Sequence, residues 1–504
     1  MSPPNAESSV KHCAAWQRYG LLLLVLILLV RLLLMLWLPL TDTTEARYAE
    51  IARKMLETGD WVTPLHDYGV PFWAKPPLST WLSALSMGLF GQSEFAVRLP
   101  SFLLALATLG LTGSLAFKRF GYGGALAAML MLASSVMFFV ASGTVMTDPT
   151  LLFCTTLIIV SFWKSMTEPS RLWPYLFFVG AGLGLLAKGP IALVLSGLPI
   201  FFWVLFKWHW LALWQRLPWL KGIVLTLVIA APWYIWAEIR TPGFLNYFIV
   251  GEHIQRFLDS GWEGDKYGFA HATPKGMIWL YAFAALVPWS VVALWWLVRW
   301  RKHSNTGARE NGWLSYLVLC CVMPLVFFTF SGNIIFPYVL PMMPAACLLL
   351  TELWQRTPAG RLSYLPGIAC FTLIIGLILL VLQAFMSSEL LRTQKLLISQ
   401  WQKLDPAPNS QLIYWSKRRE FSAEFYSNGR ARATEDPQVL RDLLSNNAKD
   451  YVVIEDKDLP DLPQDLQQTL ITLATVEVKG DHMLILAEQD PEPLEPRSEQ
   501  EVQP

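Results

Sequence analysis

The sequence has little net charge, few cysteines and no internal repeat, and each shortage excludes a class of protein. Its 39 Lys and Arg residues balance 38 Asp and Glu residues, so no strongly basic surface for nucleic acid is indicated. All six cysteines fall in or beside apolar segments, so no disulfide framework is implied. No direct or inverted repeat relates two parts of the chain, which disfavours a transporter.

Apolar residues are abundant instead. They make up 54% of the 504 residues, and the 24 tryptophans suit the aromatic belts of a membrane interface. We expect a mainly α, polytopic membrane bundle of about eleven spans, or up to 13 if shorter apolar stretches also cross. The apolar segments lie at roughly 20–38, 96–117, 121–141, 149–165, 172–187, 189–206, 218–237, 276–298, 313–331, 334–354 and 364–386.

The distribution of Lys and Arg predicts the sidedness of these spans. If residues 78–90 form an interfacial helix, nearly all basic residues of the short loops, including 299–310, fall on one side, which the positive-inside rule makes cytoplasmic. The outer side then receives a first loop at 42–94, a second loop at 238–275 and the C-terminal region. No cleavage pattern follows the first span, so we expect it to be retained.

From about residue 388 the composition becomes polar. DPQVLRDLLSNNAK predicts a helix, and DYVVIED and HMLILAE predict strands, so residues 388–487 are expected to form a small soluble α/β domain after a membrane domain of residues 1–387. The acidic, proline-rich residues 488–504 are expected to be disordered.

The first loop concentrates charged and aromatic residues beside a bilayer, which is costly unless they serve a function there. Thr43 or Thr44 is a suitable helix start, apolar residues recur at helical spacing, and Gly59 is a suitable stop. We expect this helix to lie on the membrane surface with Arg47 and Glu50 on its polar face. A merely solvated interfacial helix is the alternative.

Other polar residues are expected on the same outer side. They are Lys75 on a proline-interrupted segment, Asp148, Lys188, His253 and Arg256 in GEHIQRF, and Tyr338 in SGNIIFPYVLP. Such cations and rings outside an apolar bundle suit a lipid phosphate, whose chain would lie among the helices while Lys and Arg hold the phosphate.

Structural alternatives apply to several of these residues. Asp148 is also a suitable helix cap, Lys188 an interfacial anchor, and His253 with Arg256 a structural pair. Arg31, inside the first span, is either functional or snorkels to the interface. His66 and His271 are too isolated to predict a metal site, although a divalent cation bound by acidic side chains stays open.

Together these motifs resemble glycosyltransferase family 39, enzymes of the GT-C fold that include protein O-mannosyltransferases and the bacterial aminoarabinose transferases that modify lipid A. The matching stretches, in order, are EARYAEIARKML, GDW, KPPL, the TDP turn, AKG, EHIQRF and PYVLP, between residue 42 and about residue 345. The resemblance implies a polyprenyl-phosphate sugar donor, usually undecaprenyl phosphate, and an inverting transfer on the periplasmic face of the bacterial inner membrane. It also implies lipid A, a glycan or a protein as acceptor.

By the same resemblance, Asp42 and Glu45 are the candidate catalytic acids, because the family has adjacent acids shortly before an Arg-Tyr pair. Thr44 stands where one of those acids is expected, so which of the two is catalytic stays open. A hydroxyl acceptor would need a general base, whereas a phosphate acceptor would not. The candidates for binding the donor phosphate or substrate are Arg47, Tyr48, Lys75, Asp148, Lys188, His253, Arg256 and Tyr338.

Two functions other than a transferase make different predictions about the sequence. A lipid-linked sugar flippase predicts polar residues spread through the bundle, whereas here they gather at one face. A catalytically silent sensor or scaffold would account for the shifted acid motif. No cofactor or metal is assigned, and the expected partners are the donor, the acceptor and membrane lipid rather than nucleic acid.

Overall fold

The computed structural model describes residues 6–259, 262–268, 273–300, 312–356, 364–385, 391–446 and 448–488. The chain divides into two compact units. Met1–Leu38 and Ile51–Phe385 form the first, called here the membrane unit, and Pro39–Glu50 and Met386–Pro504 form the C-terminal unit. The expected disordered tail after residue 488, most of the loop at 299–310 and His271 lie outside the described residues.

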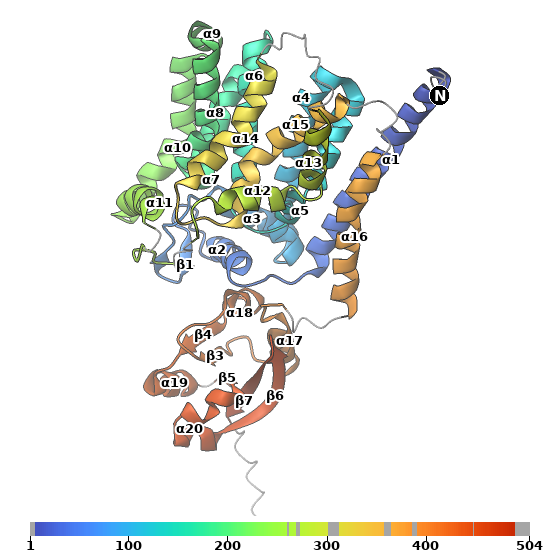
Figure 1. Cartoon of the computed structure of the whole chain (residues 1–504). Coiled ribbons are helices and arrows are strands. Elements are labelled where there is room, and N and C mark those ends of the chain that lie inside the picture. The colour runs from blue at the N-terminus through green and yellow to red at the C-terminus, as the bar shows by residue number, and fades with distance from the viewer. Residues whose placement is uncertain are drawn as a thin grey trace, which may run out of the picture. The chain divides into compact units, whose positions relative to one another are not determined.

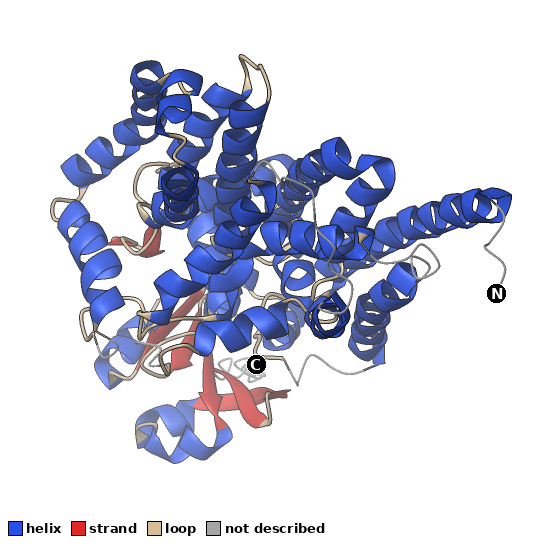
Figure 2. Ribbon diagram, turned by 45° about the horizontal axis from the view of Figure 1, so that its top comes forward, coloured by secondary structure: helices blue, strands red, loops and turns tan. Residues whose placement is uncertain are grey.

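The membrane unit is almost entirely helical (Figure 1; Figure 2). Six described helices are long and apolar enough to cross a membrane, and the bent pair α12 and α13 would make a seventh span. The prediction of a mainly helical, multi-pass membrane protein is therefore confirmed.

The helices in and entering this unit are α1 (Ala6–Trp37), α2 (Thr44–Thr58), α3 (Leu78–Phe90), α4 (Glu94–Ala133), α5 (Val136–Ala141), α6 (Asp148–Thr167), α7 (Trp173–Lys188), α8 (Ile191–Lys207), α9 (Trp210–Arg216), α10 (Trp219–Arg240), the π-helix η1 (Asn246–Gln255), α11 (Arg256–Leu258), α12 (Met277–Ala285), α13 (Trp289–Trp300), α14 (Trp313–Thr329), the 3₁₀-helix η2 (Phe336–Met342), α15 (Met343–Gln355) and α16 (Tyr364–Phe385). A short antiparallel hairpin joins β1 (Leu65–Asp67) to β2 (Val70–Pro71).

Helix α4 contains the predicted segment 96–117 and the first part of the segment 121–141, which the sequence predicted as separate, and the end of the second segment forms α5. It begins after Ser93, whose hydroxyl accepts a hydrogen bond from the Ala96 N–H at 3.2 Å, as an N-cap does. The helix is broken at Gly121, where φ is +70°, a conformation that favours glycine.

Helices α6 and α7 pack closely because small residues face the contact. A Cβ atom added to Gly180 would lie 2.9 Å from Ile158 Cγ1, and one added to Gly184 would lie 3.6 Å from Cys154 Cβ. This packing brings the first residue of α6, Asp148, beside the last residue of α7, Lys188. Toward the other end of α6 the core is aromatic: Tyr316 of α14 stacks on Trp163 of α6 at 4.9 Å between ring centroids.

Arg31 does not snorkel out of the bundle. Its side chain is buried, and its guanidinium donates to the Val140 carbonyl at 2.7 Å and to the Thr144 hydroxyl at 3.2 Å. The snorkelling alternative is wrong because the last turn of α5 offers a carbonyl acceptor inside the protein.

The C-terminal unit is built on a five-stranded mixed sheet of order β4-β3-β5-β7-β6. Strand β3 is parallel to β4 and β5, and β7 is antiparallel to β5 and β6. Its elements are α17 (Lys395–Lys403), β3 (Leu412–Trp415), α18 (Phe421–Tyr426), β4 (Ala431–Thr434), α19 (Pro437–Leu444), β5 (Tyr451–Glu455), the 3₁₀-helix η5 (Asp456–Asp461), α20 (Gln464–Thr469), β6 (Leu470–Val478) and β7 (Asp481–Glu488).

Alternating residues of this sheet bury its two faces under different helices. Leu412 packs in one cluster with Trp401 of α17, whereas its neighbour Ile413 packs in another with Leu440 of α19 and Leu466 of α20. The sheet therefore lies between helices on both faces. The predicted helix (α19) and the two predicted strands (β5 and β7) are confirmed, but β3, β4 and β6 were missed.

Candidate active site

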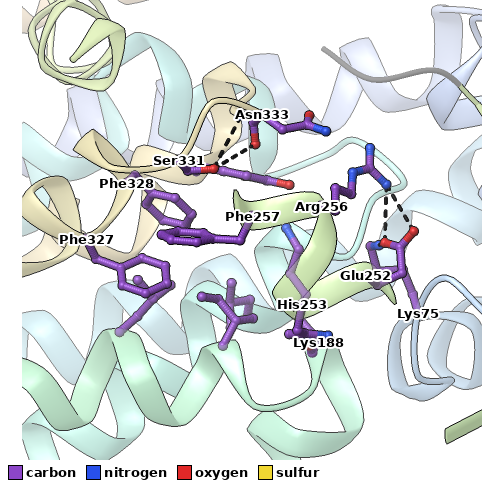
Figure 3. Close-up of a pocket in the computed structure, with 14 residues that line it drawn as sticks. Lys75, Lys188, Glu252, His253, Arg256, Phe257, Phe327, Phe328, Ser331 and Asn333 are labelled. Carbon is purple, nitrogen blue, oxygen red and sulfur yellow. Dashed lines mark hydrogen bonds and ion pairs between the residues drawn. The ribbon is translucent and has the colours of Figure 1, made fainter. Parts of the chain in front are cut away.

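A pocket in the membrane unit gathers five of the predicted site residues. It holds about 670 Å³ of empty space, which includes open solvent. Figure 3 shows phenylalanine rings on one side and the charged groups of Lys75, Glu252 and Arg256 on the other. The lining residues are Lys75, Leu151, Lys188, Ile191, Leu195, Glu252, His253, Arg256, Phe257, Phe327, Phe328, Ser331, Asn333 and Tyr338.

Lys188 enters this pocket from the end of α7 as half of a buried ion pair. Its Nζ lies 2.7 Å from Asp148 Oδ1, and both side chains are less than a tenth exposed. Its ammonium also lies 4.5 Å from the centre of the Tyr338 ring. The interfacial-anchor alternative for Lys188 is therefore wrong, and Asp148, in the first turn of α6, pairs with a cation in addition to any role at the helix end.

The glycine of the AKG motif, Gly189, allows η1 to pack closely against the end of α7. Gly189 ends α7 with φ of +79°, and a Cβ there would lie 2.6 Å from Phe248 and 3.1 Å from His253 Nε2. Only glycine allows the π-helix η1 to approach so closely. His253 Nδ1 lies 2.8 Å from the Phe248 carbonyl and Nε2 lies 3.2 Å from the Lys188 carbonyl. Burial lowers the pKa of His253, with the nearby charge of Lys75 adding to the shift.

The wide turn of η1 also places Glu252 at the centre of a charge cluster. Its carboxylate lies 2.8 Å from Lys75 Nζ and 3.1 Å from Arg256 Nη1, and its side chain is only 2% exposed. Arg256 also pairs with Asp265 at 3.2 Å. Burial raises the pKa of Glu252, but the charges of Lys75 and Arg256 outweigh burial and leave its pKa below the ordinary value.

The segment before Lys75 is held by the second loop. The Tyr267 hydroxyl donates to the Pro71 carbonyl at 2.7 Å and accepts from the Trp73 N–H at 3.0 Å. The Lys266 ammonium lies 4.3 Å from the centre of the Trp73 ring. These contacts, together with the pairing of β2 with β1, fix the proline-flanked stretch that precedes Lys75.

The remaining predicted residues lie in the C-terminal unit, at the beginning of α2. The Asp42 carboxylate accepts from the Ser422 N–H at 3.0 Å and from the Ser422 hydroxyl, and the Asp42 N–H donates to the Arg392 carbonyl at 2.8 Å. Burial raises the pKa of Asp42 to about 7, with Glu420 adding to the rise, while the Ser422 hydrogen bonds and Arg392 oppose it.

Helix α2 runs from Thr44 to Thr58, as the start and stop signals predicted, with Gly59 at φ of +69° after it. Glu45 is buried and accepts from the Thr41 N–H at 3.4 Å, and the Arg47 guanidinium lies 5.5 Å from the centre of the buried Tyr48 ring. The prediction that Glu50 faces solvent is wrong, because its side chain is fully buried.

No group of three or more His, Cys, Asp or Glu side chains that could hold a metal ion occurs within the described ranges. Sequence reasoning did not select Glu252 or Tyr267 as site residues. The spacing of Glu252 and Arg256, four apart in GEHIQRF, could have indicated the Glu252 pair. Tyr267 carries no such local signal, because its partners lie in the first loop.

Fold and pocket together define a polytopic helical membrane protein of the GT-C type, with a pocket lined by cations at one end and by phenyl rings at the other. Residues 15–248 match the family model of dolichyl-phosphate-mannose-protein mannosyltransferase, so the family resemblance inferred from the motifs is confirmed. The chain is 29% identical to an undecaprenyl phosphate-alpha-4-amino-4-deoxy-L-arabinose arabinosyl transferase of Aeromonas hydrophila over 371 residues, which are 69% of this chain and 62% of that protein. It is 32% identical to the protein of the same name from Erwinia tasmaniensis over 329 residues, which are 63% of this chain and 55% of that protein.

The fold also matches a solved structure. ArnT from Cupriavidus metallidurans, crystallised with bound undecaprenyl phosphate, aligns with a TM-score of 0.75 at 19% identity over 93% of this chain and 97% of that one. The same protein in its apo state aligns with a TM-score of 0.73. At this identity, the match establishes the fold.

Proposed function

We propose that this protein is a membrane glycosyltransferase that moves a sugar from a polyprenyl-phosphate donor, such as undecaprenyl phosphate, to an envelope acceptor such as lipid A, a glycan or a protein. The observation that carries this proposal is the pocket, in which Lys75, Lys188 and Arg256 converge beside phenyl rings. A phosphate joined to a hydrocarbon chain has the same two-part character. The names of the relatives support 4-amino-4-deoxy-L-arabinose as the first sugar to test.

In the proposed reaction, an acceptor oxygen attacks C1 of the sugar from the side opposite the phosphate. The bond between C1 and the phosphate oxygen breaks, that oxygen keeps the electron pair, and the anomeric configuration inverts. Lys75, Arg256 and Arg47 stabilise the charge that grows on the leaving phosphate. A hydroxyl acceptor passes its proton to Asp42 or Glu45, whereas a phosphate acceptor has no proton to transfer.

The proposed topology has eleven crossings. It counts the parts of α4 on either side of Gly121 as two spans, the bent pair α12 and α13 as one, and α3 as an interfacial helix. The first loop and the C-terminal region then face the periplasm of a bacterial inner membrane, and residues 299–310 face the cytoplasm. Reporter fusions at Asn305 and Asn428 should be active with opposite reporters, and activity of one reporter at both sites contradicts this topology.

Reconstituted transfer tests the proposed function directly. The full-length protein in detergent is incubated with undecaprenyl-phosphate aminoarabinose and lipid A, and mass spectrometry follows both products. The expected result is one added sugar per modified lipid A and an equal amount of undecaprenyl phosphate. Lipid A, glycans and envelope proteins of a deletion strain, compared with the parent, identify the acceptor. Folded protein that transfers no sugar from any polyprenyl-phosphate donor, with no glycan change in the deletion strain, contradicts the proposal.

A further inference from the structure

The three cations of the pocket are already matched by three carboxylates. Lys188 pairs with Asp148 at 2.7 Å, Lys75 with Glu252 at 2.8 Å, and Arg256 with Asp265 at 3.2 Å as well as with Glu252. A phosphate that enters this pocket therefore adds negative charge to a balanced group of side chains. Every further unit of phosphate charge is opposed by carboxylates that lie close by in a site of reduced dielectric.

Glu252 is the carboxylate that the two phosphate-facing cations share. All three side chains line the pocket, where Lys75 and Arg256 are each nearly a fifth exposed and Glu252 is 2% exposed. The Tyr247 hydroxyl donates to Glu252 at 3.4 Å. Within the described part of this loop, Asp265, His253 and Tyr267 also interact electrostatically with this cluster, and Tyr338 faces Arg256. Glu252 stays ionised at neutral pH because its two cations hold its pKa low.

The proposed transfer changes the charge of the lipid phosphate. A donor is a phosphodiester with one negative charge, whereas the polyprenyl phosphate left after transfer is a monoester that carries up to two above its second pKa near 6. We propose that Glu252 is a specificity-determining residue, which makes the pocket favour the singly charged phosphodiester over the doubly charged phosphomonoester and so limits retention of the product. This inference rests on the proposed function, because it assumes that the pocket holds the lipid phosphate.

A purely structural role for Glu252 makes a different prediction. If Glu252 only positions Lys75 and Arg256, its loss weakens the binding of both phosphates alike. Glu252→Gln separates the two roles, because the amide keeps the size of the side chain and one acceptor oxygen but removes the charge. Glu57→Gln is the matched control, since Glu57 pairs with Arg53 at 2.9 Å, is 47% exposed and does not line the pocket.

The test compares two ligands on the full-length protein in detergent: undecaprenyl phosphate and its methyl diester, which has the same chain and one ionisable oxygen fewer. Affinities are measured by ligand-induced change in tryptophan fluorescence at pH 8 and pH 5.5. At pH 8, Glu252→Gln should bind the monoester about tenfold tighter and the diester about threefold tighter than wild type, because the repulsion that is removed scales with the charge of the phosphate. At pH 5.5 most of this difference should disappear, because the monoester is then mainly singly charged. Glu57→Gln should behave as wild type.

The wild-type protein provides a second measurement that does not depend on the variant folding. Its affinity for the monoester relative to the diester should fall as the pH rises from 5.5 to 8, and a constant or rising ratio overturns the inference. An equal change of both affinities in Glu252→Gln, or no change in their ratio, also overturns it while leaving the transferase proposal intact. A wild-type protein that binds neither ligand overturns both, so the two failures are distinguishable.

Discussion

The two halves of the first loop belong to different structural units. Pro39–Glu50 clusters with the C-terminal unit, and its Asp42 is bonded to Ser422, 380 residues away. The rear half belongs to the membrane unit, and its Lys75 pairs with Glu252, 177 residues away. One continuous run of charged residues therefore supplies two sets of contacts, one within each unit.

The buried carboxylates of Asp42 and Glu252 differ in the charge of the groups that bind them. Asp42 receives hydrogen bonds mainly from a neutral serine, so burial prevails and its pKa rises to about 7. Glu252 has two cations, so its pKa falls despite burial. The comparison indicates that Asp42 is able to exchange a proton near neutral pH. Glu252, which pairs with Lys75, stays charged.

The largest expected effect tests the two candidate catalytic acids, Asp42 and Glu45. Asp42→Asn should lower turnover by about 100- to 10,000-fold, the usual scale for a general base, whereas Glu45→Gln should act mainly on binding or stability. Steady-state kinetics with a purified polyprenyl-phosphate sugar measure both. Ser422→Ala, which keeps the Asp42 carboxylate, should change turnover less than about tenfold.

Other outcomes for these three variants would change the roles assigned to Asp42 and Glu45. Equal losses in Ser422→Ala and Asp42→Asn would make Asp42 an anchor to Ser422 instead of a base. Full turnover in Asp42→Asn together with inactive Glu45→Gln would reverse the assignment. Unchanged turnover in both acid variants would indicate an anionic acceptor that needs no base.

The next effect tests the buried ion pair of Lys188 and Asp148. Lys188→Met should reduce the free energy of unfolding by on the order of 3–5 kcal/mol, because the Asp148 carboxylate is left buried without this cation. The measurement is thermal unfolding in detergent. Adding Asp148→Asn should restore much of the loss. Arg441→Met, which breaks the exposed pair with Asp465 in the C-terminal unit, should leave the unfolding temperature close to that of the wild type.

A smaller effect on the rate of transfer is expected when Lys75 of the first loop is replaced. Lys75→Ala should slow transfer by about 30- to 150-fold, equivalent to about 2–3 kcal/mol, while the protein still folds. Arg47→Ala in the front half should have a similar effect if both cations face the leaving phosphate. Lys75→Arg should recover part of the rate, since it keeps the charge. A Lys75→Ala protein with wild-type transfer rates would mean that this segment is only structural.

The smallest effect concerns pH. Because the folded-state pKa of Asp42 is about 7 instead of 3.8, the folded protein holds a proton between about pH 4 and pH 7 that the unfolded chain has lost. This stabilising contribution is complete below about pH 4 and is lost as the pH rises through 7. The unfolding temperature of the wild type relative to Asp42→Asn should therefore be higher at pH 5 than at pH 8. A pH-independent difference would contradict the raised pKa.

The sequence by itself determined the elements whose signals are local. Long apolar runs predicted the membrane helices, the Thr44 and Gly59 signals predicted α2, and the short apolar runs in DYVVIED and HMLILAE predicted β5 and β7. The short edge strand β4 (ARAT) and the largely exposed β6 were missed, because their conformation depends on pairing with neighbouring strands and not on their own apolar pattern.

Only the tertiary structure decided which charges meet. The sequence nominated Asp42, Lys75, Asp148 and Lys188 singly, but their partners are set by helix packing and loop contacts across the chain. The close approach of α6 and α7 at small residues joins Asp148 to Lys188, and the wide turn of η1 beside Gly189 brings Glu252 to Lys75. A charge can be read from one residue, but its partner and its pKa depend on what is buried beside it, and that is a property of the folded chain.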